Sequence, residues 1–307
     1  MNKLDQLREC LRSYGSCLVA YSGGVDSVFL ARVARDVLGD RALAVIADSP
    51  SLPRRELTEA LELAERFGIP VRVVRTEEFD NPEYLANPAN RCYFCKQELF
   101  SKLAPIAATE GFAVVVYGEN ASDVGDHRPG AQAAKESRVR APLKETGLTK
   151  EEIREFSAQL GLPTADKPQM ACLSSRIPYG ETVTPEKLRM IEDAEGLLRD
   201  LGFRDVRVRH HELRSGLKGV GSGSGTARPP GTWNGERETA VYLARIEVAP
   251  PEMPKLLGNG AAAKIGEALR GIGYAHVTLD LMGYRRGSLN EPIQLTAPPA
   301  PPVPTIG

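Results

Sequence analysis

Long hydrophobic runs, an excess of charge of one sign and a disulfide framework are all missing from this chain of 307 residues. No apolar stretch approaches the roughly 20 residues that a membrane-spanning helix needs. The 39 basic and 40 acidic residues leave a formal net charge of −1, so no general basic field would attract nucleic acid. Residues 1–9 form a charged helix pattern without the apolar core of a signal peptide. These features favour a cytoplasmic enzyme that binds neither membrane nor nucleic acid.

The five cysteines are few and odd in number, which argues against a secreted disulfide framework. Clustered cysteines in a reducing compartment are more often metal ligands or reactive thiols. Cys10 and Cys17 flank the first expected strand among apolar neighbours, so we expect both to be small core side chains. The other three, Cys92, Cys95 and Cys172, are candidates for chemistry.

Short apolar runs alternate with helical patterns over the first half of the chain. Runs such as Leu43–Ile46 are continuously apolar, as strands buried on both faces should be. Their repetition predicts an α/β domain over residues 1–165, with a parallel sheet and right-handed crossovers. The expected strands are Ser16–Tyr21, Ala42–Asp48, Val71–Arg75 and Phe112–Tyr117, and the expected helices are Ser27–Leu38, Pro53–Phe67, Cys95–Ala108 and Thr149–Leu160.

The second half has a different pattern, which predicts a smaller α+β domain over residues 166–290. A helix is expected from the N-cap Thr184, which is followed by proline, to about Leu201. A Gly/Ser/Pro-rich segment at 220–235 predicts a long loop, and the proline-rich residues 291–307 predict a disordered tail. The remaining expected elements are the strands Asp205–His210, Val241–Val248 and His276–Leu281 and the helix Ala261–Leu269.

A glycine-containing loop between the first expected strand and the next helix is the strongest functional signal. Gly23 and Gly24 let the backbone approach an anion, and the helix adds free N–H groups and its positive end. Ser22 and Ser27 supply hydroxyl donors. Asp26 is unusual in an anion site and suits a Mg²⁺ ion held against phosphates. The alternative is a strand-to-helix turn that binds no ligand.

Two other residues follow strands at the same expected edge of the sheet. Asp48 ends the second strand, and Gly118 comes directly after the fourth. The carboxyl ends of parallel strands meet at one edge, so we expect both residues near a bound ATP. Each signal is weak alone because aspartate and glycine are ordinary turn residues.

The Cys-x-x-Cys pair of Cys92 and Cys95 allows two thiols to face one metal atom or to form a redox pair. Cys172 lies far along the chain at the expected domain junction. Structural zinc sites usually have four ligands, whereas three thiolates suit an iron–sulfur cluster with one open iron. The alternatives are a helix start without metal for the pair and a free loop thiol for Cys172.

Four motifs in this order resemble the LarE family of the PP-loop, or N-type ATP pyrophosphatase, superfamily, over about residues 1–290. They are SGGVDS at 22–27, CYFCK at 92–96, GDHRPG at 125–130 and ACLSSRIPYG at 171–180. The resemblance implies a Rossmann-like domain of the HUP type that binds ATP and Mg²⁺. It also implies an ATP-dependent sulfur transferase that releases AMP and pyrophosphate. The substrate would be pyridinium-3,5-biscarboxylic acid mononucleotide, of which one carboxylate is adenylylated and converted to a thiocarboxylate. Such an enzyme serves nickel-pincer nucleotide biosynthesis and lactate racemase maturation, and is functionally linked to the other enzymes of that biosynthesis.

The family uses two sulfur sources. In one, a cysteine matching Cys172 gives up its own sulfur and becomes dehydroalanine. In the other, cysteines matching Cys92, Cys95 and Cys172 hold a 4Fe–4S cluster whose open iron carries a further sulfide. This sequence has all three cysteines, which favours the cluster, with sacrifice of Cys172 as the alternative. The resemblance also implies a homo-oligomer, a hexamer.

Several polar residues are candidates for substrate binding. Arg207 and Arg209 alternate on one expected strand, so they share a face that suits a nucleotide phosphate or, alternatively, is simply solvated. Lys96 follows Cys95 and is placed to meet a phosphate or to remain an ordinary solvated lysine. The resemblance implies active-site positions for Asp126, Arg128, Ser175, Arg176, Glu195 and Glu247.

Three other functions fit part of the sequence. A tRNA thiolation enzyme also joins a PP-loop to cysteines and an iron–sulfur cluster, but the balanced charge and the lack of an evident RNA-binding domain disfavour it. An amide-forming PP-loop ligase would leave the three cysteines without a use. An ATP-binding sensor without chemistry would not need Asp26 in a complete phosphate loop.

Overall fold

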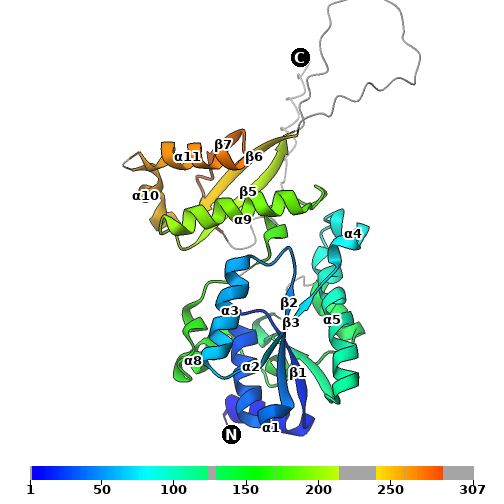
Figure 1. The fold of residues 1–307 in the computed structure, drawn as a ribbon. Coiled ribbons are helices and arrows are strands. Elements are labelled where there is room, and N and C mark those ends of the chain that lie inside the picture. The colour runs from blue at the N-terminus through cyan, green and yellow to red at the C-terminus, as the bar shows by residue number, and fades with distance from the viewer. Residues whose placement is uncertain (1, 124–128, 170, 214–239, 259, 286–307) are drawn as a thin grey trace, which may run out of the picture.

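The chain folds into a larger α/β part and a smaller α+β part stacked on it, as the ribbon in Figure 1 shows. The computed structural model describes residues 2–123, 129–169, 171–213, 240–258 and 260–285. None of the helices in these ranges is long and apolar enough to cross a membrane. The expected loop at 220–235 and the expected tail at 291–307 lie outside the described residues.

A four-stranded parallel sheet forms the centre of the larger part, with strand order β3-β2-β1-β4. All residues of β1 are buried, and they alternate between the two faces of the sheet: Val19 packs on one side and Leu18 on the other. The expected parallel α/β sheet is therefore confirmed. Its strands are β1 (Cys17–Tyr21), β2 (Ala42–Asp48), β3 (Val71–Arg75) and β4 (Val114–Tyr117).

Helices cover both faces of this sheet. One face carries α1 (Lys3–Tyr14), α2 (Val25–Leu38), α3 (Arg54–Arg66) and α8 (Lys150–Gln159), whose apolar side chains share a core with β1. The other face carries α5 (Arg91–Glu110) and α6 (Pro129–Glu136). The short helices α4 (Pro82–Leu85) and α7 (Pro142–Glu145) lie in the connections.

Two cysteine-bearing segments differ from expectation. Helix α5 begins at Arg91 rather than at Cys95, so the Cys-x-x-Cys pair lies within its first two turns. Phe94 and Cys95 pack there against an apolar cluster that includes Tyr84, and this burial stabilises the extra turn. Cys17 is a core residue as predicted. Cys10 is only half-buried, unlike the expected core residue, and its thiol contacts the hydroxyl of Tyr14.

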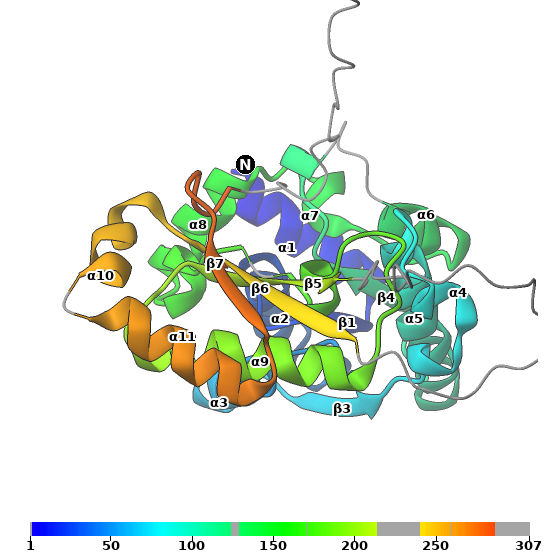
Figure 2. The same cartoon turned by 90° about the horizontal axis from the view of Figure 1, so that it is seen from above.

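The smaller part is a three-stranded mixed sheet covered by helices, which confirms the expected α+β pattern. Figure 2 shows α9 and α11 lying along this sheet. Its core includes Leu198, Val206, Ile246 and Leu269. The elements are α9 (Pro185–Asp200), β5 (Val206–Leu213), β6 (Val241–Val248), α10 (Met253–Leu257), α11 (Ala261–Ile272) and β7 (His276–Leu279). The domain boundaries at residues 165 and 290 stay predictions.

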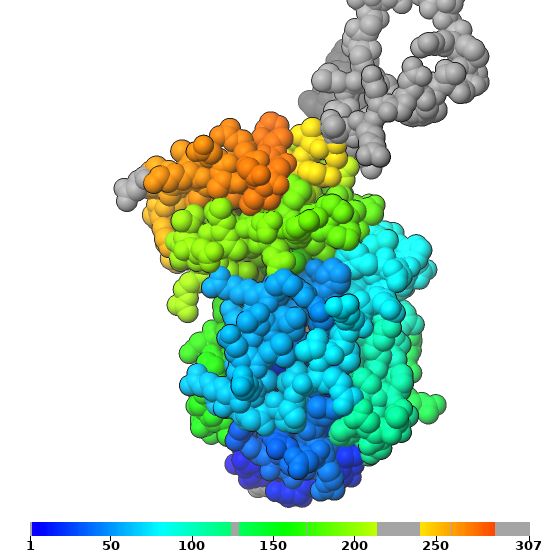
Figure 3. Space-filling view, viewed as in Figure 1, coloured from blue at the N-terminus to red at the C-terminus, as the bar shows by residue number. Residues whose placement is uncertain are grey.

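The smaller part rests on the end of the larger part where the parallel strands finish, and Figure 3 shows the two surfaces in contact. Helix α3 starts just after the carboxyl end of β2, and its Arg55 forms an ion pair of 3.0 Å with Asp200 of α9. The backbone N–H of Arg54 donates to the carboxylate of Glu192, also in α9. The ATP-binding edge expected for the sheet therefore faces the smaller part.

Candidate active site

The phosphate loop connects β1 directly to α2 and is held by hydrogen bonds within itself. Gly23 has a φ of +70°, and a Cβ there would stand 2.6 Å from Cβ of Ala60, so a side chain does not fit. The Ser27 hydroxyl accepts from the backbone N–H of Ser22 and donates to the carbonyl oxygen of Gly24, each at 3.1 Å. Helix α2 starts directly after Gly24, and the first N–H groups of a helix have no partner within it, so they are available to an anion.

Gly118, at the end of β4, lies against the start of α2. A Cβ at this position would stand 3.0 Å from Cβ of Asp26 and 3.1 Å from the backbone nitrogen of Ser27. Glycine is therefore needed here for close packing against the phosphate loop. Direct contact of Gly118 with ATP stays a prediction.

Asp26 forms an ion pair with Lys150, a residue that the sequence patterns did not indicate. The ammonium group of Lys150 donates to Oδ2 of Asp26 at 2.7 Å, and both side chains are partly exposed. Lys150 is the first residue of α8, fixed there by a capping box between Thr149 and Glu152. That box is visible in the sequence, but it does not show which strand edge the helix start will meet. The ion pair therefore places the ammonium group of Lys150 beside Asp26, the expected Mg²⁺ ligand.

Asp48 lies at the carboxyl end of β2, where its side chain contacts that of Arg54. The Arg54 guanidinium forms an ion pair with the Asp48 carboxylate and donates to the carbonyl oxygens of Ser49 and Leu52, at 2.6 and 2.8 Å. These contacts order the turn after β2. A role for Asp48 in binding ATP stays a prediction.

Three buried hydroxyl groups join this turn to the segment that carries Cys172. Ser51 and Tyr84 are hydrogen-bonded to each other, and the Ser174 hydroxyl lies 2.7 Å from that of Ser51 and 2.8 Å from that of Tyr84. The backbone N–H of Leu173 also donates to the carbonyl oxygen of Ser51 at 2.8 Å. Cys172 is thereby anchored beside the carboxyl end of β2. No local pattern in the sequence indicated this cluster, because its members come from three separate segments.

The three candidate cysteines gather in one region. Burial, and next the thiol of Cys172, raise the pKa of Cys92, and the same two causes raise the pKa of Cys95 to about 12. Cys95 also packs against the apolar cluster that contains Leu173, the residue after Cys172. The Cys92 side chain is exposed at the surface, although neighbouring atoms still desolvate its sulfur, while Cys95 and Cys172 are half-buried. Within the described part of the chain, no three His, Cys, Asp or Glu side chains are arranged to hold a metal ion.

Arg176 and Glu195 form a buried ion pair that contacts the backbone of the Cys172 segment. Two guanidinium nitrogens of Arg176 donate to the two oxygens of Glu195 at 2.8 and 2.9 Å, and the side chains are 1% and 0% exposed. The third donates to the carbonyl oxygens of Ala171 and Cys172, at 2.8 and 3.0 Å. Burial acts to raise the pKa of Glu195, but Arg176 more than offsets it and holds that pKa below the ordinary value. The pair therefore fixes the backbone around Cys172.

Arg207 and Arg209 of β5 point at the same segment. Both are buried, which contradicts the alternative of a solvated strand face. Arg209 donates to the carbonyl oxygen of Ser175 and to Glu247, each at 2.8 Å, and Arg207 donates to the carbonyl oxygen of Gln169 at 3.0 Å. Burial and the neighbouring Arg176 lower the pKa of Arg207. A concentration of positive charge thus lies over the Cys172 segment.

The last candidates are Lys96 in α5 and two residues of the GDHRPG motif at 125–130. Lys96 lies close to Gly130, where an added Cβ would stand 3.0 Å from Cγ of Lys96. The Lys96 ammonium lies 5.9 Å from the ring centre of Phe100. Asp126 and Arg128 lie outside the described residues. Their roles, like that of Lys96, stay predictions.

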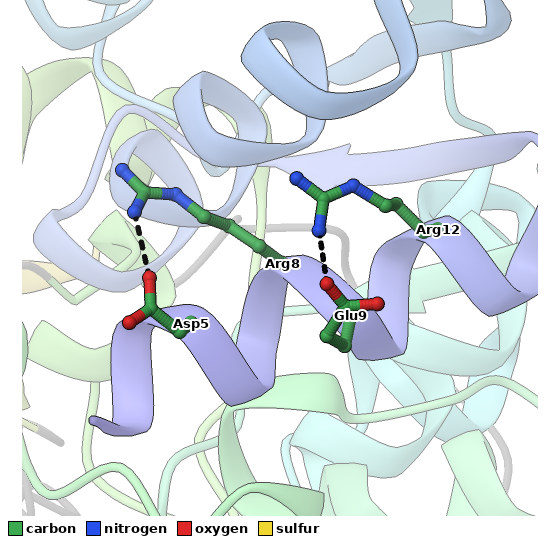
Figure 4. Close-up of a pocket in the computed structure, with 4 residues that line it drawn as sticks. All are labelled: Asp5, Arg8, Glu9 and Arg12. Atoms are coloured by element: carbon green, nitrogen blue, oxygen red, sulfur yellow. Dashed lines mark hydrogen bonds and ion pairs between the residues drawn. The ribbon is translucent and has the colours of Figure 1, made fainter. Parts of the chain in front are cut away.

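A separate recess lies on α1, far along the fold from the cysteines, and Figure 4 shows its lining. Asp5, Arg8, Glu9 and Arg12 surround it. These residues pair within the helix, Asp5 with Arg8 and Glu9 with Arg12, at a spacing of three. Because the opposite charges neutralise each other, the recess offers little to attract a charged ligand.

Comparison with known proteins decides the family. The chain is 32% identical to the pyridinium-3,5-bisthiocarboxylic acid mononucleotide synthase of Lactiplantibacillus plantarum, over 94% of both chains. The chain belongs to the family of this synthase. A family model described as NAD synthase matches residues 2–84, which include the phosphate loop. Membership of the synthase family makes this chain an ATP-using PP-loop enzyme.

Other relatives extend this grouping. An uncharacterized protein of Synechocystis is 43% identical over 94% of this chain and 97% of its own length. The tRNA-specific 2-thiouridylase MnmA of Azorhizobium caulinodans is 29% identical over 77% of this chain and 67% of its own length. The second of these relatives is named as a thiouridylase.

Proposed function

We propose that this chain is an ATP-dependent sulfur transferase that acts on pyridinium-3,5-biscarboxylic acid mononucleotide in nickel-pincer nucleotide biosynthesis. The relative from L. plantarum is named for the corresponding bisthiocarboxylic product. The observation that carries the proposal is the buried hydroxyl cluster of Ser51, Tyr84 and Ser174, which ties the Cys172 segment to the ATP-binding edge of the sheet. A phosphate loop and a group of thiols that open onto one edge suit an activation step followed by sulfur transfer.

Activation is needed because a carboxylate would have to expel oxide. In the first step a carboxylate oxygen attacks the α-phosphorus of ATP, and pyrophosphate leaves. In the second, an anionic sulfur attacks the acyl carbon, and AMP leaves with the oxygen. The loop at Gly23 and Gly24 would bind the phosphates, and Asp26 would hold the Mg²⁺ that neutralises them. The site must also exclude water, because hydrolysis would waste the acyl-adenylate.

Cys92, Cys95 and Cys172 would hold a 4Fe–4S cluster, which would supply sulfide for the second step. The contribution of the Cys172 thiol to the raised pKa of both Cys92 and Cys95 supports this assignment, because three neighbouring thiols suit a cluster with one open iron. The alternative is donation of the Cys172 sulfur itself. In either case the ion pair of Arg176 and Glu195 would keep Cys172 at the ATP edge.

The substrate's phosphate would meet the positive charge at the junction of the two parts. Arg207 and Arg209 both donate to backbone carbonyls of the Cys172 segment, and a phosphate is a stronger acceptor than a carbonyl. Glu247 would orient Arg209 through their 2.8 Å contact. A homo-oligomer, a hexamer, remains part of the proposal.

The test is an anaerobic assay of protein reconstituted with iron and sulfide. Incubation with ATP, Mg²⁺ and the biscarboxylic mononucleotide should yield AMP, pyrophosphate and a thiocarboxylate identified by mass spectrometry. Bulk tRNA in place of the mononucleotide tests the thiouridylase-like function that the similarity to MnmA suggests. Loss of a sulfur from Cys172 after one reaction would show sacrifice, and an unchanged chain would support the cluster.

A further inference from the structure

Tyr179 lies on a turn that is anchored on both sides and leaves the tyrosine at the surface. Tyr179 is 42% exposed, whereas Ile177 before it and Val183 after it are buried in an apolar cluster with Tyr84. The backbone N–H of Val183 donates to the carbonyl oxygen of Leu85 at 2.9 Å, so the chain returns to α4 directly after the turn. The exposed position of Tyr179 therefore belongs to an anchored turn.

A fully buried asparagine holds the backbone on both sides of Tyr179. The side-chain amide of Asn87 donates to the carbonyl oxygens of Pro178 and Ile177, at 2.8 and 3.2 Å. The backbone carbonyl oxygen of Asn87 accepts from the N–H of Gly180 at 3.0 Å. Asn87 has a φ of +53°, a left-handed conformation that is costly for residues with a side chain. Such strain persists where the surrounding structure enforces it and is concentrated at ligand sites, which suggests that Tyr179 contacts a ligand.

The same contacts join the turn to the segments that carry the cysteines. Arg91, the first residue of α5, donates to the side-chain oxygen of Asn87 and, at 2.9 Å, to the carbonyl oxygen of Ser174. Burial raises the pKa of the Tyr179 phenol, and the charges of Arg91 and Arg209 act against this rise. These opposing effects are consistent with a phenol ring close to both guanidinium groups. An exposed ring is thus fixed beside the Cys172 segment and the positive charge that lies over it.

We propose that Tyr179 is the surface on which the pyridinium ring of the substrate stacks, and that it makes the site select a cationic ring. The identity of the substrate rests on the proposed function. The face of a phenol ring carries negative partial charge, so it attracts a cationic aromatic ring that lies flat on it. The neighbouring arginines suit the anionic groups of the same substrate. Adenine, the other aromatic ring in the reaction, is neutral and gains less from this contact.

The test compares two probes that differ in the charge of the ring. Nicotinamide mononucleotide carries a pyridinium ring, and its reduced form carries an uncharged dihydropyridine ring on the same ribose phosphate. Neither has a carboxylate to activate, so isothermal titration calorimetry of the full reconstituted chain measures binding without reaction. The preference for the oxidised form, given by the ratio of the two dissociation constants, should fall about fivefold in Tyr179→Leu and be retained in Tyr179→Phe. The arginines are unchanged in both variants, so their attraction for the phosphate cancels from the comparison.

An unchanged ratio in Tyr179→Leu would overturn the inference, because a residue that only supports the turn would not discriminate between the two rings. Absence of binding of either probe to the wild type would overturn it as well. If Tyr179→Leu does not fold, Tyr179→Gln takes its place with the same expected ratio. Sulfur transfer to the biscarboxylic mononucleotide is scored separately. Transfer by the wild type with an unchanged ratio would reject only the stacking role, and a lowered ratio without transfer would reject only the proposed function.

Discussion

Lys150 donates a hydrogen bond of 2.7 Å to Asp26, joining the start of α8 to the first turn of α2 at the mouth of the phosphate loop. The two residues are 124 positions apart in the chain, so only the fold brings them together. When Mg²⁺ and ATP bind, Asp26 would exchange the ammonium group for the metal ion. The freed ammonium would then lie beside the phosphates, which gives Lys150 a role in binding ATP.

Replacing Lys150 by methionine tests this exchange. Loss of one charge-assisted hydrogen bond to phosphate should raise the KM for ATP about tenfold, and Lys150→Arg should restore part of the affinity. ATP-dependent pyrophosphate release, measured with the mononucleotide substrate present, gives both constants. An unchanged KM together with a lowered Tm would show that the ion pair only supports the fold.

Gly118→Ala tests the close packing behind the phosphate loop. The added Cβ would press on the backbone of α2, which cannot move aside as a flexible side chain would. We expect the free energy of unfolding to fall by about 1–3 kcal/mol and ATP turnover to fall at least tenfold. Gly196→Ala in α9 is the matched control, since a Cβ there meets nothing within 4 Å, and it should be neutral or stabilising. Equal behaviour of the two variants would contradict the packing argument.

The ion pair of Arg176 and Glu195 provides a prediction that separates stability from activity. Arg176→Met leaves a buried carboxylate without its main partner and should cost about 3–5 kcal/mol of unfolding free energy. The double variant Arg176→Met/Glu195→Met should recover much of that loss, because neither charge is then stranded. It should still fail to transfer sulfur, because the carbonyl oxygens of Ala171 and Cys172 lose their donor. Full activity in the double variant would show that Arg176 does not position Cys172.

His210 should make stability depend on pH. It is fully buried beside the Tyr274 hydroxyl, and burial, followed by the charge of Lys187, lowers its pKa to about 4. The unfolded chain, with a histidine pKa of about 6.5, binds more protons than the folded one between these values. The stability of the neutral state is therefore fully present above about pH 6.5 and is lost as the pH falls towards 4. The free energy of unfolding of His210→Gln, measured with urea at several pH values, should change less over this pH interval than that of the wild type. An equal pH dependence in the two proteins would assign the acid sensitivity to other groups.

Local patterns in the sequence were enough to predict the central sheet. The continuous apolar runs of β1 and β2 require burial on both faces, and this follows from composition alone. The phosphate loop was equally readable, because its glycines and hydroxyls are contiguous and lie between a strand and a helix. In the second part, the N-cap Thr184 and the alternating β5 were likewise local signals.

The contacts that assemble the site were not readable in this way. No sequence pattern distinguishes Ser51, Tyr84 and Ser174, because the fold brings them together from three separate segments. The only local signal near Lys150 was the cap of its helix. Arg207 and Arg209 were correctly given a shared face, but their burial depends on the packing of the smaller part against the larger. Arg91 escaped notice because a basic residue before Cys-x-x-Cys suggests a solvated charge, and only its burial shows otherwise.

The central claim is that the phosphate loop and the cysteines serve successive steps of one reaction. A single-turnover experiment on anaerobically reconstituted protein tests it most directly, by following AMP and thiocarboxylate together in wild type, Asp26→Ala and Cys172→Ala. The account predicts that Asp26→Ala forms neither product, and that Cys172→Ala still forms AMP or an acyl-adenylate but no thiocarboxylate. Thiocarboxylate formed at the wild-type level by Cys172→Ala, or no AMP from the wild type with its substrate, would contradict it.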